Sequence, residues 1–508
     1  MTTRKLSVRN NQSWELDRLS VLDEETFRKR VIEEVRSGGR IANLFGLLEE
    51  TGDVRIFALI GQDEQSKLSL FSFRVSQGAP FFRSLTPELP QAHWFEREIA
   101  EQYSIKPEGH PWLKPIRYHK NYRNAPGLWP ESDGKTAPGR NDFFKAGGEE
   151  IHEVAVGPVH AGIIEPGHFR FSCHGEKILN LEIQLGYQHR GVEKMMQEVP
   201  AVRRALLAES IAGDTVIGHA MAYCSAMESL SACRISPRAE ALRFVALELE
   251  RLANHAGDLA SLGADIGFLP TAAYFGRLRG EFLNLLMELT GNRYGRSFLR
   301  PGGVLFDMDA KMIDAFKHRL REAKEEMRDV SNLFFEQPSV LSRLENVGVI
   351  SAESVRELGF VGVAARASGC ARDVRMDYAH GMYRFHQVPI SLANSGDVYS
   401  RAMIRWLESQ RSIDVLLELF ERMPKGDLMA ALGPLKERYM TVSMVEGWRG
   451  EIIHTVITGP DSQIARYKVK DPSFNNWFAL SEAVRGGQIS DFPLCNKSFN
   501  LSYAGHDL

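Results

Sequence analysis

Residues 209–233 read Glu-Ser-Ile-Ala-Gly-Asp-Thr-Val-Ile-Gly-His-Ala-Met-Ala-Tyr-Cys-Ser-Ala-Met-Glu-Ser-Leu-Ser-Ala-Cys, and the rest of the chain is organised around this stretch. From Asp214 to Cys233 it carries alanine, serine, glycine and methionine on several faces of a helix. Such a pattern is typical of a helix that other helices surround. We therefore expect a mostly helical domain with this segment inside it.

Four further segments carry apolar residues at the spacing of one helix face. The stripe between Leu242 and Leu259 is the most regular of them. The others lie at 278–289, 312–330 and, with gaps, 404–420. Four such helices side by side predict a central helix bundle.

The composition sets outer limits on fold and function. A chain of 508 residues is too long for one hydrophobic core, so we expect at least two domains. The net charge of -3 gives no support for nucleic acid binding. The N-terminus lacks the apolar core of a signal peptide, and no run of about 18 apolar residues is present. We expect a cytoplasmic protein with no transmembrane segment of its own.

The first 120 residues predict a small α+β domain. Residues 26–35 have the charge density of an exposed helix. Residues 41–48 and 54–60 resemble a hairpin with a glycine at its turn, and 67–75 a strand with one buried face. Residues 121–148 are rich in Asn, Gly, Pro and Lys without periodicity, which predicts a linker between domains 1–120 and 149–508.

The second domain begins with strand-like runs at 169–172 and 178–185, joined through His174-Gly-Glu. They predict a peripheral β-sheet at the N-terminal edge of this domain. The expected fold class is therefore α+β, with a small N-terminal α+β domain and a large, mostly helical domain.

Two sets of motifs carry a family resemblance. The run from Trp94, with Glu96-Arg-Glu and Gly109-His-Pro, resembles the 30 kDa subunit of complex I. From the residues alone, this run reads as a solvated helix followed by a turn. Further on, the chain resembles the large subunit shared by complex I and membrane-bound nickel-iron hydrogenases. The motifs there include Gly186-Tyr-Gln-His-Arg-Gly, Glu248-Leu-Glu-Arg and Arg366-Ala-Ser-Gly, and continue with Glu446-Gly-Trp-Arg-Gly-Glu and Asp471-Pro-Ser-Phe. The fusion of the two modules resembles formate hydrogenlyase and hydrogenase-4 large subunits.

The resemblance implies a metal cradle that this chain does not keep. In the hydrogenases two Cys-x-x-Cys pairs bind nickel and iron. Ala212 and Thr215 stand at the first pair here, with His219 marking the register, and Ser502 and Gly505 stand at the second. The five cysteines include no Cys-x-x-Cys. Because these metals need soft thiolates, we expect no metal and no hydrogenase activity.

Two functions from different classes remain open. In the first, the emptied pocket accepts a quinone or another small electron carrier, and electrons arrive from a [4Fe-4S] cluster in a partner subunit. In the second, the chain is a non-catalytic structural and coupling subunit. For the first, Glu165 and His219 are the expected catalytic residues. The expected pocket is lined by His160, His168, Ala212, Gly213, Asp214, Thr215, Arg366, Ser502 and Gly505.

The resemblance also implies partners and a geometry. We expect a small iron-sulfur subunit and membrane-arm subunits, which would hold the chain at the cytoplasmic face of the inner membrane. The chain itself should bind no cofactor. We expect Ala212 and Thr215 to lie close to Ser502 and Gly505, with Glu165, His219 and Arg366 beside one small cavity. We also expect the two domains to meet through a polar interface.

Overall fold

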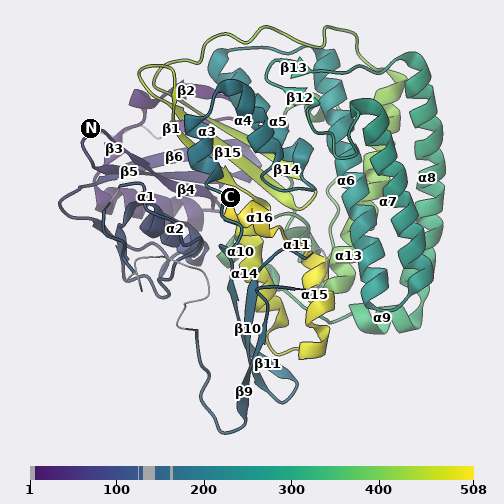
Figure 1. Ribbon diagram of the computed structural model, residues 1–508, viewed down its shortest axis with the longest axis horizontal. Coiled ribbons are helices and arrows are strands. Elements are labelled where there is room, and N and C mark those ends of the chain that lie inside the picture. The colour runs from purple at the N-terminus through teal and green to yellow at the C-terminus, as the bar shows by residue number, and fades with distance from the viewer. Residues whose placement is uncertain (1–5, 124, 130–142, 161–163) are drawn as a thin grey trace.

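The computed structural model describes residues 6–123, 125–129, 143–160 and 164–508. Figure 1 shows the N-terminal unit on one side, a block of long helices on the other, and the C-terminal segments between them. The fold class is α+β, as predicted.

The N-terminal unit is built on a mixed sheet with the order β1-β6-β5-β4. Strands β4 and β5 form the predicted hairpin, and Gly52 adopts a φ of 84° in its turn. The short strand β3 pairs with β6 in parallel. The bounds are β1 Leu6–Val8, β3 Val21–Leu22, β4 Arg40–Leu48, β5 Val54–Gln62 and β6 Lys67–Val75.

Strand β6 is buried on both faces, so the prediction of one buried face is wrong. Phe71 and Phe73 pack into a core with helices α1 (Glu24–Arg36) and α2 (His93–Tyr103). Leu68 and Leu70, on the other face, pack against residues of a C-terminal sheet. A second protein layer thus replaces the solvent that an isolated α+β domain would have on that face.

That C-terminal sheet was not predicted. Strands β14 (Tyr439–Gly447), β15 (Gly450–Thr458) and β16 (Ile464–Lys470) form an antiparallel meander, and the N-terminal strand β2 (Ser13–Glu15) pairs with β14. The N-terminal unit therefore contributes a strand to a sheet of the second domain.

The interface between the two units combines buried ion pairs with an apolar cluster, whereas we expected a polar interface. Trp14, Phe45 and Phe57 share one cluster with Val442 and Ile453. Buried ion pairs accompany these contacts, as between Glu98 and Lys468 at 2.7 Å. Every residue of α2 is buried as well, so the helix at Trp94 is not solvated.

The described residues of 121–148 form no helix or strand, and residues 124 and 130–142 of the predicted linker lie outside the described ranges. Beyond this segment stands the predicted hairpin of β10 (His168–His174) and β11 (Lys177–Gln184), with Gly175 at its turn. Strand β9 (Ile151–Val156) pairs with β10 and completes a three-stranded sheet. This sheet projects below the helical body in Figure 1.

The helical body confirms the predicted bundle. Helices α6 (Pro237–Asp265), α7 (Leu269–Thr290), α8 (Ala310–Glu336) and α13 (Val398–Glu421) pack side by side around one apolar core. Helix α5 (Val216–Ser231) is buried on nearly every face, as its small residues predict. Helices α6, α8 and α13 each begin with a side-chain cap. The side chains of Ser236, Asp309 and Asp397 accept a backbone N–H of the first turn of these helices.

Short elements connect these layers. The helices are α3 Val192–Glu198, α4 Ala201–Glu209, α9 Pro338–Leu344, α10 Ala352–Leu358, α11 Gly362–Ala367, α12 Val374–Asp377, α14 Pro472–Val484, α15 Phe492–Phe499 and α16 Tyr503–Asp507. The 3-10 turns are Leu16–Arg18, Asp63–Gln65, Pro90–Ala92, Gly381–Arg384 and Ile489–Asp491. The remaining strands are β7 Phe81–Arg83, β8 Lys106–Glu108, β12 Leu299–Arg300 and β13 Gly303–Val304.

Candidate functional site

The segment before α5 and the C-terminal tail meet, and Arg449 joins them. Its guanidinium binds both carboxylate oxygens of Asp214, at 2.5 and 2.7 Å. It also donates to the Thr215 hydroxyl at 3.0 Å and to the backbone carbonyl of Asn500. One buried side chain therefore binds both segments at once.

A tight turn positions this arginine. Trp448 and Arg449 form the two-residue connection between β14 and β15, where Gly447 pairs with Gly450. The Trp448 indole N–H donates to the Asp214 carbonyl at 3.0 Å and to the Thr215 hydroxyl at 3.1 Å. The Arg449 guanidinium stacks over the indole ring, 3.9 Å from its centroid. Both turn residues thus face the start of α5.

His219 begins a buried chain of hydrogen bonds. Its Nε2 lies 3.0 Å from Asp471 Oδ2, and its Nδ1 lies 3.1 Å from His454 Nε2. His454 Nδ1 in turn lies 2.7 Å from the Tyr467 hydroxyl. Burial, followed by the nearby His219, lowers the pKa of His454 well below its usual value, so this ring stays neutral.

Asp471 also packs against the tail. A Cβ atom added at Gly505 would lie 2.7 Å from the Asp471 carboxyl carbon, so a side chain there would displace this carboxylate. Burial alone would raise the pKa of Asp471, but the hydrogen bond and charge of His219, together with the charge of Arg449, outweigh burial and lower the pKa. The Ser502 hydroxyl accepts the Gly505 N–H at 2.9 Å and caps the final helix.

Arg449 and Asp471 thus each contact residues of both parts of the site, and the close approach of Ala212 and Thr215 to Ser502 and Gly505 stays a prediction. Ala212 is fully buried. Gly213 is exposed, and the side chain of Asp214 is one-third exposed. The frame formed by residues 209–219 and 497–508 therefore opens to the surface at Gly213 and Asp214.

Glu165 stands at the same edge. Its Oε2 accepts the backbone N–H of Tyr503 at 3.1 Å, which ties it to the tail. Burial raises the pKa of this carboxyl, and the nearby Asp214 adds to the rise while Arg449 opposes it. A half-buried carboxyl of this kind can exchange protons nearer to neutral pH than an ordinary glutamate.

The side chains of His160 and His168 contact backbone carbonyl groups of their own segment. His160 Nε2 lies 2.9 Å from the Gly167 carbonyl, and His168 Nδ1 lies 3.2 Å from the Gly157 carbonyl. Residues 161–163 between them lie outside the described ranges. In the described part of the chain, neither histidine is hydrogen-bonded to residues 212–215.

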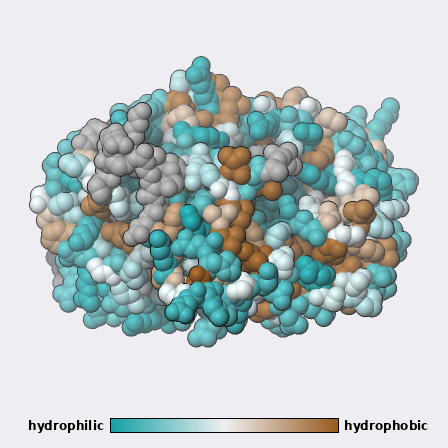
Figure 2. All heavy atoms as spheres, turned by 60° about the horizontal axis from the view of Figure 1, so that its bottom comes forward, coloured by the Kyte–Doolittle hydropathy of each residue, from teal (hydrophilic) through white to brown (hydrophobic). Residues whose placement is uncertain are grey.

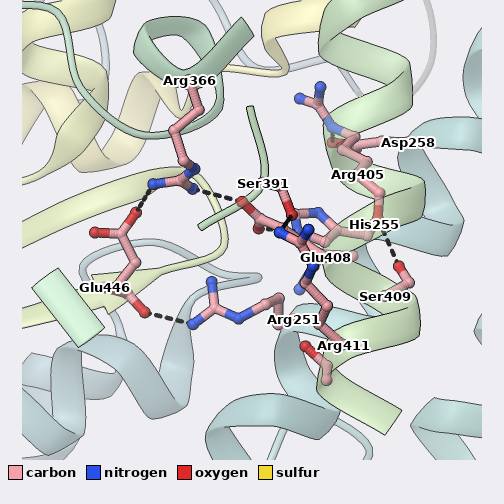
Figure 3. A network of polar contacts seen from close by, with 12 residues as sticks. Arg251, His255, Asp258, Arg366, Ser391, Arg405, Glu408, Ser409, Arg411 and Glu446 are labelled. Atoms are coloured by element: carbon pink, nitrogen blue, oxygen red, sulfur yellow. Dashed lines mark hydrogen bonds and ion pairs between the residues drawn. The ribbon is translucent and has the colours of Figure 1, made fainter. Parts of the chain in front are cut away.

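Arg366 lies in a different buried network, shown in Figure 3. It pairs with Glu446 at 2.7 Å and with Glu408 at 2.8 Å. Arg366 and Glu408 are fully buried, and His255 binds the second oxygen of Glu408 at 2.8 Å. Within the described residues, the ion pairs of Arg366 are with carboxylates of the helical body and of β14.

The three residues expected beside one cavity are therefore separated. Glu165 reaches the surface edge, whereas His219 and Arg366 are fully enclosed by protein. A cleft of about 910 Å³ does open elsewhere, and its lining includes none of the three.

Sequence reasoning did not assign roles to Trp448, Arg449, Asp471 and His454. Trp448, Arg449 and Asp471 all lie in motifs that carry the family resemblance. For Trp448 and Arg449, the sequence also contains a pattern that predicts their turn. Gly447-Trp-Arg-Gly450 separates two runs rich in β-branched residues, which predicts a hairpin with a two-residue turn.

The residues at the four cradle positions do not fit a nickel-iron group. Ala212 and Gly505 offer no side-chain donor. The Thr215 hydroxyl is engaged by Arg449 and Trp448, and the Ser502 hydroxyl by the backbone. In the described ranges, no group of three or more His, Cys, Asp or Glu side chains is arranged to hold a metal ion.

Comparison with known proteins places this frame in a family. Residues 265–438 and 431–507 match the family described as the 49 Kd subunit of respiratory-chain NADH dehydrogenase, and residues 49–143 match that of its 30 Kd subunit. The chain belongs to the family that unites these subunits with the large subunits of related hydrogenases.

Individual relatives cover most of the chain. It is 32% identical over 350 residues to the carbon monoxide-induced hydrogenase of Rhodospirillum rubrum, covering 69% of this chain and 97% of that protein. It is 27% identical over 520 residues to formate hydrogenlyase subunit 5 of Escherichia coli, covering 98% and 90%. With NADH-quinone oxidoreductase subunit 4 of Thermus thermophilus it shares 28% over 369 residues, covering 67% and 90%.

Among the described helices none has the length and apolarity to cross a membrane. A relative from Pyrococcus furiosus is named as the alpha subunit of a membrane-bound hydrogenase. The chain is thus related to large subunits of membrane-associated oxidoreductase complexes.

Proposed function

We propose that this chain is the large subunit of a complex I-like assembly without a nickel-iron centre, and that it supports electron transfer to a quinone or a similar organic acceptor. Electrons would come from a [4Fe-4S] cluster in a small partner subunit. Membrane-arm subunits would hold the assembly at the cytoplasmic face of the inner membrane and couple electron transfer to ion movement.

The observation that carries this proposal is the open edge of the frame. Gly213, Asp214 and Glu165 reach the surface there, next to the Arg449 guanidinium. Reduction of a quinone to a quinol consumes two electrons and two protons. The electrons would arrive from the partner's cluster, and Glu165, with its raised pKa, would pass protons from solvent to the acceptor oxygens.

The surface around this edge suits a covering partner. Val159 is 86% exposed and Val202 is 80% exposed, and Ile164 and Leu206 are about half exposed. These apolar side chains lie on the segments that flank Glu165 and residues 212–215 in sequence. Figure 2 also shows hydrophobic residues gathered near the middle of one face of the molecule. Exposed apolar side chains of this kind are typical of protein–protein contacts.

One observation favours a second candidate, a non-catalytic structural and coupling subunit. The interior of the frame is occupied by Arg449 and Asp471, whose hydrogen bonds are made within the chain. An arrangement of this kind holds the two segments together without a metal. In this alternative, the frame transmits mechanical contact between partners and binds no acceptor.

The purified complex distinguishes the two. With the partner's cluster reduced, we expect it to reduce a short-chain benzoquinone, and Glu165→Gln to slow turnover by about 100-fold through loss of proton transfer. Glu153→Gln, an exposed carboxylate on β9, is the matched control and should leave turnover unchanged. A complex that carries a reducible cluster yet reduces no quinone supports the structural function. One nickel per chain in elemental analysis would contradict both.

A further inference from the structure

A second region of the chain forms a cleft of about 910 Å³, and none of the candidate site residues described above lines it. Its walls come from the end of α5, the start of α6, the turn at 379–385 and the residues after α13. Asn10 of the N-terminal unit closes one side, and its amide donates to the carbonyls of Tyr378 and Met444 at 3.0 Å. Volumes of this size are typical of sites for small molecules.

The charges around the cleft are unbalanced. In its interior, Arg243 is neutralised by two hydrogen bonds to Glu228, at 3.0 and 2.6 Å. Three further arginines line the cleft, namely Arg234, Arg384 and Arg422, and all three are exposed. No carboxylate of the described residues lies within ion-pair distance of any of them. Glu240 is the other carboxylate in the lining, and the nearby charge of Arg384 favours its ionised form, so two of the three cations remain without a carboxylate.

The cleft also offers flat apolar surface and a free polar group. Phe385 is 70% exposed, and the Arg384 guanidinium lies 5.7 Å from its ring centroid, whereas Phe244 and Tyr383, which also line the cleft, are buried. His380 lines the cleft and leaves at least one ring nitrogen without a hydrogen-bond partner. This nitrogen is therefore able to form a hydrogen bond with a bound ligand.

We propose that this cleft binds a phosphate-bearing small molecule of nucleotide size. Guanidinium groups bind phosphate through paired, charge-assisted hydrogen bonds. A phosphate monoester carries nearly two negative charges and so matches the excess of cations better than a single carboxylate does. The exposed ring of Phe385 provides a surface on which a planar group stacks.

The test is a titration of the purified full-length chain with three probes. They are ADP, inorganic pyrophosphate and vesicles of phosphatidylglycerol, each followed by calorimetry. We expect ADP to bind with one site per chain. The double variant Arg234→Gln/Arg422→Gln should bind about 100-fold more weakly, because each of the two lost charge-assisted hydrogen bonds accounts for about tenfold in affinity. Both substitutions are at exposed positions, so circular dichroism should show an unchanged fold.

Arg356→Gln is the matched control, an exposed arginine on α10 that does not line the cleft. It should bind ADP as the wild type does. Binding of the vesicles alone, lost in the double variant, would identify the phosphate as a lipid headgroup. The proposal is overturned if none of the three probes binds, or if the double variant and the control bind equally well.

Discussion

Two buried arginines show how differently one residue type serves in this fold. Arg366 lies between helices, enclosed by Glu408, Glu446 and Asp373, and has no exposed surface. Arg449 lies in a hairpin turn and joins a carboxylate that is one-third exposed to the C-terminal tail. Arg366 was expected to line the pocket, whereas Arg449 was given no role. The difference teaches that a motif arginine marks a site only when its partners reach the surface.

The largest effect should come from the enclosed arginine. Arg366→Met leaves two buried carboxylates without their main partner, so we expect the free energy of unfolding to fall by about 3 to 5 kcal/mol. Urea titration measures this. Arg321→Met, whose ion pair with Glu421 is exposed, should change stability by less than about 0.5 kcal/mol. Similar values for the two variants would show that burial does not distinguish them.

Loss of the bridging arginine should cost less, because solvent reaches one of its partners. We expect Arg449→Gln to destabilise the chain by about 2 kcal/mol and to expose the C-terminal tail to limited proteolysis. Arg438→Gln, at the other end of β14 with an exposed pair to Asp17, is the control. If the tail resists the protease in both variants, Arg449 does not hold the two segments together.

Substitutions at Gly505 and Gly213 compare the packed interior of the frame with its exposed edge. Gly505→Ala places a methyl group against the Asp471 carboxylate and should destabilise the chain by about 1 to 2 kcal/mol. A Cβ atom at Gly213 meets nothing within 4 Å, so Gly213→Ala should be nearly neutral. Thermal unfolding compares the two variants. Equal midpoints would mean that Asp471 moves freely and that the interior is not packed.

The smallest effect concerns pH. Glu250 accepts the backbone N–H groups of Ile217 and Gly218 at the start of α5, and burial raises its pKa to about 8. The folded chain then holds a proton that the unfolded chain releases near pH 4.5. Its contribution to stability is therefore full at low pH and is lost as the pH rises toward 8.

Glu250→Gln cannot titrate, so its stability relative to the wild type should rise by about 1 kcal/mol between pH 6 and pH 7. Urea titrations at the two pH values measure the difference. The exposed Glu357→Gln is the control and should show no such dependence. A wild-type chain whose difference from Glu250→Gln is constant over this range would contradict the raised pKa.

Much of the fold follows from local patterns. The hairpin of β4 and β5 and the helices α6, α7, α8 and α13 could be predicted because their apolar residues recur at fixed periods. The sheet of β14, β15 and β16 was missed, since strands buried on both faces show no alternation. The prediction that α2 is a solvated helix was also wrong. Its charged residues are buried, because they form ion pairs with residues from other segments of the chain.

The sequence by itself determined the family, the helical bundle and the absence of any Cys-x-x-Cys pair, because motif spacing and residue identity are local properties. Only the tertiary structure decided what stands between the two segments. Arg449 lies in the turn between β14 and β15, and Asp471 directly precedes α14. Both are more than 200 residues away in sequence from their partners Asp214 and His219. Contacts between such distant residues depend on how sheets and helices pack, and no local pattern encodes them.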